Sequence, residues 1–269
     1  MSAIHHHHHL PPAEPSIEAA CKSFAVPDRV LASGKEVDWL SKGKRARLMV
    51  GADQVVYWTF GNGPRVLLVH GWCSRGSHLL SFVEPLLSMG FSVTLFDAPG
   101  HGDSSGEVSS MVHAGRAVRA LAEEIGHVRA VIGHSAGSMA ALWAFANGVS
   151  VARSVHIGGP SSLTQIVNGS AHLHGLDRQQ TQAFSAWVES FVGVPLHSLD
   201  LPTLIAGALA PGLIIHDVDD RVVDIRQSQL LHAAWPTSRL VVTSGLGHRR
   251  ILTDPYTVAT AVEFLKDAV

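Results

Sequence analysis

A serine between two glycines is the residue whose setting most directly suggests chemistry. Gly133-His-Ser-Ala-Gly137 places Ser135 after an apolar run that ends at Ile132 and before a helical pattern that starts at Ser138. A strand, a sharp turn and a helix in this order expose the serine hydroxyl, and small flanking residues prevent collisions at the turn. The N-terminus of the helix would direct amide N–H groups towards an oxyanion. A helix cap in a glycine-rich turn has the same composition, so the neighbouring motifs decide between the two interpretations.

Two further motifs follow predicted strands. His70-Gly-Trp72 closes the apolar run 65–70, where a flexible backbone lets an amide point into a cleft. We expect the backbone N–H groups of Trp72 and Ala136 to form an oxyanion hole. Asp97-Ala-Pro-Gly-His-Gly-Asp-Ser104 closes the next run. Together, and in this order, the three motifs resemble the N-terminal half of the α/β-hydrolase superfamily, in particular its serine esterases and lipases. The resemblance extends to the C-terminus apart from the segment 160–209, and it implies a structural role for Asp97.

The resemblance also implies that an acid and then a histidine follow the nucleophile along the chain. The run 213–223 reads as a strand followed by a cluster of three aspartates. It is similar to the acid loop of the family, in which the catalytic aspartate precedes two residues and a valine, and this similarity selects Asp220. Asp219 is the main alternative, and Asp217 is disfavoured because it lies closer to the strand.

The base is expected in the loop after the last predicted strand. Gly245-Leu-Gly-His248 matches the position of the family's histidine loop, and its glycines let the ring reach the cleft without a side-chain clash. His232 is the other histidine after the acids, but it falls within a helical stretch. In this triad the imidazole of His248 takes the proton of Ser135 as the oxygen attacks a carbonyl, and the carboxylate of Asp220 orients the ring.

Short apolar runs alternate with amphipathic stretches over most of the chain, which predicts a parallel sheet with right-handed crossovers. The fold class expected is therefore α/β, with a mostly parallel eight-stranded α/β-hydrolase sheet, helices on both faces and a small helical lid insertion. The predicted strands are 48–50, 55–60, 65–70, 92–96, 130–132, 154–157, 213–216 and 240–243, and the predicted helices are 78–89, 113–125, 138–147, 227–234 and 256–266.

The pattern divides the chain into three parts. Residues 1–44 form an N-terminal extension with one or two short helices and a head, His5–His9, that reads as a tag or a low-complexity segment. Residues 45–159 and 210–269 form the hydrolase core, and residues 160–209 form a helical lid because no strand pattern appears there. Aromatic residues spaced by three and four in this lid, centred on Trp187, form an apolar helix face. That face either packs the lid down or lines the substrate pocket.

Composition excludes several functional classes. The 20 basic and 22 acidic residues are balanced, so no long-range field favours nucleic acid or an anionic membrane. Two distant cysteines match no metal spacing, and the N-terminus lacks an apolar leader, so we expect a reducing, cytoplasmic setting. No apolar run approaches the roughly 20 residues of a membrane span. Neither a metal site nor a cofactor motif is recognised.

The expected activity is therefore that of a cofactor-free carboxylesterase-like serine hydrolase acting on small-molecule esters of small to medium acyl chains. Trp72, His134 and Trp187 are expected to contact the substrate. Acyl transfer, perhydrolysis or carbon–carbon hydrolysis on the same triad remain alternatives, as does a non-catalytic ligand-binding protein of the same fold. Relatives that cleave epoxides or carbon–halogen bonds carry aspartate at the elbow, so serine disfavours those reactions. The sequence leaves the oligomeric state open.

Overall fold

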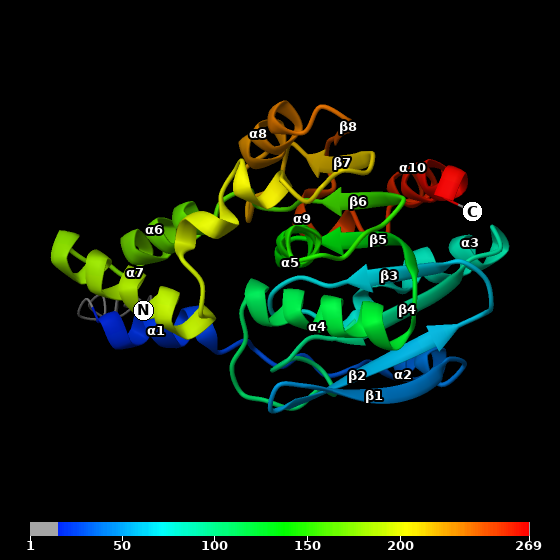
Figure 1. Ribbon diagram of the computed structural model, residues 1–269, viewed down its shortest axis with the longest axis horizontal. Coiled ribbons are helices and arrows are strands. Elements are labelled where there is room, and N and C mark those ends of the chain that lie inside the picture. Colours follow the sequence, from blue (N-terminus) through cyan, green and yellow to red (C-terminus); the bar gives the residue numbers. More distant parts are fainter. Residues whose placement is uncertain (1–15, 269) are drawn as a thin grey trace, which may run out of the picture.

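A computed structural model describes residues 16–268, and the histidine run 5–9 lies outside them. One eight-stranded sheet runs through this part of the chain in the order β1-β2-β4-β3-β5-β6-β7-β8 (Figure 1). β2 is antiparallel to both its neighbours, and the strands from β4 across to β8 are parallel. The strands are β1 Lys44–Val50, β2 Asp53–Phe60, β3 Arg65–Val69, β4 Ser92–Asp97, β5 Val128–His134, β6 Arg153–Ile157, β7 Gly212–Asp217 and β8 Ser238–Thr243.

Helices cover both faces of the sheet. α4, α5 and the buried side of α8 share one apolar core with one face, whereas α3 and α10 pack on the other. The central strands are buried on both sides, which explains why they read as continuous apolar runs. The helices are α1 Ile17–Ala25, α2 Gly34–Leu40, α3 Val83–Ser88, α4 Met111–Glu124, α5 Ala136–Ala146, α6 Leu163–Leu173, α7 Arg178–Val192, α8 Arg226–Ala234, α9 Gly247–Arg250 and α10 Pro255–Leu265.

All eight predicted strands and the predicted helices of the core are confirmed, with one difference in type. The stretch expected as one helix over 78–89 begins as a 3-10 helix, η1 (Gly76–Phe82), and becomes α-helical only at Val83. Pro85 explains the break, because proline has no N–H to donate and its ring collides with the carbonyl four residues earlier. An α-helix therefore cannot continue through Ser81 and include Pro85 in its interior.

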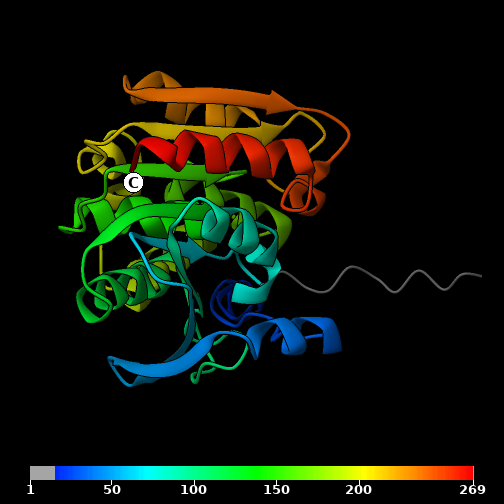
Figure 2. The same cartoon turned by 90° about the vertical axis from the view of Figure 1, so that its right-hand side faces the viewer.

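The two segments outside the core pack against each other. Between β6 and β7 lie α6, α7 and the short 3-10 helices η2 (Leu196–Leu199) and η3 (Thr203–Ile205). Figure 1 shows α6 and α7 gathered beside α1 at one end of the molecule. α2 instead packs against η1 (Figure 2). Within residues 16–268, no helix combines the length and the apolar character needed to cross a bilayer.

Candidate active site

The nucleophile elbow connects β5 to α5 through a strained serine. Ser135 has φ 53° and ψ −125°, in a region that side-chain-bearing residues rarely adopt, and its N–H donates to the carbonyl of Ile157 at 2.9 Å. Sterics require both glycines of the motif. A Cβ at Gly133 would lie 2.8 Å from the backbone of the first turn of α5, and a Cβ at Gly137 would collide with the carbonyl oxygens at the end of β3. The interpretation of Ser135 as a simple helix cap is not supported, because it makes no side-chain capping bond.

Loops after β7 and β8 bring the predicted acid and base to this serine. His248 Nε2 lies 2.9 Å from Ser135 Oγ, and His248 Nδ1 lies 2.6 Å from Asp220 Oδ2. Because a carboxylate only accepts, Nδ1 carries the proton and Nε2 is left to accept from the serine hydroxyl. Asp219 faces elsewhere, since its Oδ2 accepts from the Gly245 N–H at 2.7 Å. The structure thus brings Asp220, and not its neighbour, to the histidine.

Asp220 is held by a second imidazole. His216 Nε2 approaches Asp220 Oδ2 to 3.4 Å and also donates to the carbonyl of Val223 at 2.9 Å, while the Ser228 hydroxyl bonds His216 Nδ1 at 2.6 Å. The side chains of His216 and Asp220 are 0% and 2% exposed. Burial alone would raise the pKa of Asp220, but hydrogen bonds from His216, His248 and two backbone amides hold that pKa far below its ordinary value.

Asp217, the disfavoured candidate for the acid, holds the histidine loop in place. Its carboxylate accepts from the N–H of Gly247 at 2.9 Å, the N–H of Leu246 at 3.2 Å and the hydroxyl of Thr243 at 2.8 Å. Burial opposes the charge of Asp217, yet these bonds lower its pKa. The three aspartates therefore have different roles. Asp217 and Asp219 bind the loop that carries His248, and Asp220 contacts the imidazole itself.

The loop after β3 lies against the nucleophile. A Cβ on Gly71 would come within 2.9 Å of the Ser135 Cβ, so the backbone on either side of Gly71 borders the reacting atoms. His70 shapes this loop, with Nε2 accepting from the Ala98 N–H at 2.9 Å and Nδ1 bonding the Gly71 carbonyl at 2.7 Å. Ala136 is the first residue of α5, and the N–H groups of a first helical turn have no partner within the helix. Trp72, which follows Gly71, and Ala136, which follows Ser135, are thus both close to the serine along the chain segments that border it.

A pocket of about 660 Å³ opens over Ser135. Trp72 and His134, which the sequence predicts to contact substrate, are among the residues that line it. The His134 ring packs 4.7 Å from the His248 ring, and its Nε2 lies 2.9 Å from the His248 carbonyl, to which it donates. Burial first, and the nearby His248 second, lower the pKa of His134 to about 3, so the ring is neutral at physiological pH. A neutral ring with Nε2 protonated supports the His248 loop without adding a charge to the site.

The expectation that Trp187 contacts substrate is corrected by the structure. Trp187 on α7 packs with its ring centroid 6.5 Å from that of Phe24 on α1 and stacks 5.1 Å from Phe191. No residue of the segment 160–209 is among those that line the Ser135 pocket. The apolar face of α7 is therefore covered by the N-terminal extension, which is the packing alternative left open by the sequence.

The wall of the pocket that sequence reasoning missed comes from α2, η1 and α9. Ser33 and Glu36 form a capping box, a local signal that does predict the start of α2. The signal does not say where the helix docks. In the structure the Ser77 hydroxyl donates to Glu36 at 2.6 Å, and Leu40 at the end of α2 is buried in the core. The pocket-lining residues that were not predicted are Lys35, Glu36, Trp39, Ser74, Ser77, His78, Leu80, Ser81, Val222, Arg249, Leu252 and Thr253.

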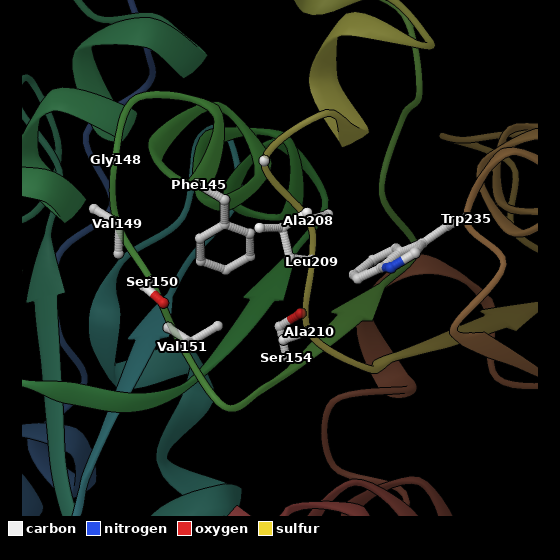
Figure 3. A pocket seen from close by; sticks show the side chains of 11 residues that line it. Phe145, Gly148, Val149, Ser150, Val151, Ser154, Ala208, Leu209, Ala210 and Trp235 are labelled. Atoms are coloured by element: carbon white, nitrogen blue, oxygen red, sulfur yellow. The ribbon is translucent and has the colours of Figure 1, made fainter.

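A second, smaller pocket of about 240 Å³ lies at the amino ends of β6 and β7, away from the triad (Figure 3). Phe145 and Trp235 face one another across it, with the exposed Leu209 between them (Figure 3). None of the described residues that line this pocket is ionisable. Its lining therefore offers no general acid or base, although it includes the hydroxyls of Ser150 and Ser154.

Known proteins resemble the chain in sequence and in fold. A family model described as the alpha/beta hydrolase fold matches residues 64–204, more than half of the chain. A pimeloyl-[acyl-carrier protein] methyl ester esterase of Methylococcus capsulatus is 50% identical over 46 residues, which are 17% of this chain and 18% of that protein. A fluoroacetate dehalogenase of Burkholderia sp is 38% identical over 64 residues, which are 24% of this chain and 21% of that protein. The matches thus span about a fifth of each of these relatives.

Solved structures extend the likeness to nearly the whole fold. An esterase of Pyrococcus furiosus superposes with a TM-score of 0.70 at 21% identity, covering 91% of this chain and 98% of that one. The mouse alpha/beta hydrolase domain-containing protein 10 has a TM-score of 0.63 at 15% identity, covering 83% and 97%. At these identities the likeness concerns the fold. Together with the family model, it establishes that the chain belongs to the α/β-hydrolase fold family.

Proposed function

We propose that the protein is a serine hydrolase that cleaves carboxylic esters of small to medium acyl chains through an acyl-enzyme intermediate. The hydrogen-bond chain from Asp220 through His248 to Ser135 carries the proposal. As Ser135 Oγ attacks the carbonyl carbon, His248 Nε2 takes the hydroxyl proton. Collapse of the tetrahedral intermediate breaks the bond to the alcohol, which leaves with that proton. A water then repeats both steps and releases the acid.

The negative charge of each tetrahedral intermediate would be stabilised by the amides of Trp72 and Ala136. The Ala136 amide lies at the N-terminus of α5, where the helix dipole adds a favourable field, and the Trp72 amide belongs to the residue after Gly71, whose position adjoins Ser135. The strained backbone at Ser135 holds the hydroxyl away from the helix axis and towards the pocket. The volume of the pocket, about 660 Å³, suits a small-molecule ester.

The serine at the elbow is consistent with the chemistry of one of the two curated relatives but not with that of the other. The family members that break carbon–halogen bonds use aspartate as the nucleophile, so the match to a dehalogenase does not extend to the reacting atom. The match to a methyl ester esterase is consistent with the serine. Each match covers about a fifth of the relative, and we use neither to name the substrate.

Hydrolysis of p-nitrophenyl esters from acetate to dodecanoate tests the proposal directly. The unmodified protein should turn over the shorter members, and Ser135→Ala should lower the rate to background. A fluorophosphonate probe should label Ser135 in the same preparation. Labelling without ester turnover would contradict the ester class, and release of product only when an alcohol or a peroxide replaces water would assign acyl transfer instead. Neither labelling nor turnover would favour a non-catalytic binding protein.

The acid is tested by a matched pair of substitutions. Asp220→Asn should lower kcat by about 10³–10⁴-fold, because an amide cannot hold the required imidazole tautomer. Asp219→Asn should lower it by less than about tenfold, since an amide oxygen can still accept from Gly245. Equal losses in both variants, each with an unchanged melting temperature, would contradict the assignment.

A further inference from the structure

The charges that line the Ser135 pocket are unbalanced. Lys35 on α2 and Arg249 on α9 both line it and are both exposed to solvent. Over residues 16–268, neither cation has a carboxylate partner within ion-pair distance. The two charges come from different elements, so no single surface helix accounts for both.

The one carboxylate in the pocket lining is already engaged. Glu36 Oε1 accepts from the Ser77 hydroxyl at 2.6 Å, and Oε2 accepts from the N–H and the hydroxyl of Ser33 at 2.8 and 2.6 Å. Burial would raise the pKa of Glu36, but these bonds outweigh it and keep the group charged. Glu36 therefore caps and docks α2, and both its oxygens already accept hydrogen bonds from the protein.

The remaining ionisable groups near the pocket add no compensating negative charge. His78 lies 3.8 Å from Glu36, and burial lowers its pKa, so it is neutral at physiological pH. The carboxylate of Asp220 is 2% exposed and bonded to two imidazoles. Asp28 approaches the rim, where its N–H donates to Cys73 Sγ at 3.2 Å, but its side chain does not line the pocket.

Arg249 acts on the pocket and not only on bulk solvent. Three side chains that line the pocket feel this charge. Burial lowers the pKa of His78 and His134 and Arg249 adds to that effect, whereas burial raises the pKa of Cys73 and Arg249 partly offsets the rise. Arg249 also directly follows His248 on α9, so the pocket wall that carries this cation adjoins the triad. The rest of the lining includes the rings of Trp39 and Trp72 and two leucines, which favour methylene groups.

We propose that the preferred substrates are esters whose apolar chain ends in a carboxylate, and that Lys35 and Arg249 bind that carboxylate. This inference rests on the proposed esterase function and names the substrate class of the same site. A planar guanidinium matches a carboxylate in a bidentate geometry, and a lysine adds a point charge from a second element of the lining. An uncharged ester of the same length would leave both cations without a partner.

Monomethyl adipate and methyl hexanoate form a matched pair of substrates, because they differ only in a terminal carboxylate or methyl group. Proton release from both is measured with the unmodified protein, Lys35→Gln, Arg249→Gln and the double variant. Lys44→Gln, an exposed cation on β1 outside the pocket lining, is the control. Acetyl esters of 4-hydroxybutyrate and of butanol place the carboxylate on the alcohol side and show which part of the substrate carries it.

The expected readout is the ratio of kcat/KM for the charged ester to that for the neutral ester. It should exceed 1 in the unmodified protein, fall about fivefold in each single variant through KM, and fall further in the double variant. Added salt should lower the ratio, because exposed charges are screened. A ratio below 1, or a ratio that both variants leave unchanged while Ser135-dependent turnover persists, would overturn the inference and leave the esterase function standing.

A binding measurement separates failure of the inference from failure of the chemistry. In Ser135→Ala protein, monomethyl adipate is titrated against intrinsic tryptophan fluorescence, to which Trp39 and Trp72 in the pocket contribute. The Lys35→Gln/Arg249→Gln variant should raise the Kd about tenfold or more. Equal Kd values would refute the carboxylate site whatever the catalytic result. A higher Kd in the Lys35→Gln/Arg249→Gln variant, together with no turnover of either ester by the unmodified protein, would support the carboxylate site and refute the esterase function.

Discussion

His216 should set the pH range over which the triad works. One oxygen of Asp220, Oδ2, is shared between His248 Nδ1 at 2.6 Å and His216 Nε2 at 3.4 Å. The His216 ring cannot turn away, because its nitrogens also bond the Val223 carbonyl and the Ser228 hydroxyl. A donor on the far side of Asp220 spreads the negative charge that would otherwise act on His248 alone.

The perturbation is His216→Phe, which keeps a ring at a fully buried position but removes the donor to Asp220. Hydrogen bonds to charged groups contribute about 1.5–3 kcal/mol, and a contact of 3.4 Å belongs at or below the lower end of that range. A loss of about 1.4 kcal/mol corresponds to about tenfold in kcat/KM or about one pH unit. Without the donor, the carboxylate favours the imidazolium form of His248, which cannot accept the serine proton. The acidic limb of the kcat/KM profile should therefore move to higher pH by up to about one unit.

The assay is kcat/KM for p-nitrophenyl butyrate between pH 5 and 9, with thermal melts of each variant. His216→Gln, which can present an amide donor near the position of Nε2, should restore most of the profile. His156→Phe, at another fully buried histidine on the adjacent strand β6, is a control for ring substitution in the core. A folded His216→Phe protein whose acidic limb coincides with that of the unmodified protein would refute the reasoning. If His216→Phe does not fold, Ser228→Ala serves instead, because it removes the hydrogen bond to His216 Nδ1. An acidic limb of the kcat/KM profile that does not move in Ser228→Ala would then refute the reasoning equally.

Two further predictions concern stability. Gly137→Ala should destabilise the fold by at least about 3 kcal/mol, because its Cβ meets backbone carbonyls that cannot move away. Gly169→Ala in α6, where a Cβ meets nothing within 4 Å, should instead stabilise it by up to about 1 kcal/mol; urea denaturation measures both, and equal effects would contradict the steric account. Burial lowers the pKa of His156 to about 3 from an ordinary value of 6.5, so the unfolded chain binds the extra proton as the pH falls between these values and stability is lost on acidification. His156→Gln should reduce the slope of the unfolding free energy against pH between these two values by up to about 1.4 kcal/mol per pH unit. A similar reduction in His172→Gln, at an exposed histidine, would contradict the assignment of the slope to the buried ring.

Local patterns were sufficient where the physical cause is local. Strands buried on both faces must be apolar throughout, so their runs were readable without tertiary information. Gly133 and Gly137 mark the elbow because no other residue fits against the neighbouring backbone. The resemblance to the family's histidine loop selected His248, and the sheet explains why that loop reaches Ser135, since parallel strands bring their carboxyl ends to one edge.

The choice between two adjacent acids is harder to make from the sequence. Asp219 and Asp220 are chemically identical neighbours, and the family pattern alone ranked them. What separates them is the turn after β7, in which the N–H groups of Val222 and Val223 donate to Asp220 Oδ1 at 2.8 and 2.9 Å. These bonds aim Oδ2 at His248. The same turn leaves Asp219 facing Gly245, so the direction of each carboxylate is a property of the folded loop.

An apolar helix face in a sequence indicates that the face is buried, but it does not indicate which partner buries it. The aromatic face of α7 was compatible with substrate or with protein, and Phe24 of α1 supplies the protein partner through edge-to-face contacts with Phe184, Trp187 and Phe191. Since α1 occupies that face, the segment 160–209 contributes nothing to the described pocket lining, and α2 takes the place next to Ser135 that the insertion was expected to fill. The helix α2, which precedes the first strand, thus contributes Lys35, Glu36 and Trp39 to the pocket lining, and its Glu36 accepts from the Ser77 hydroxyl, 41 positions away. It follows that exchanging α2 between relatives should alter substrate preference more than exchanging α6 and α7.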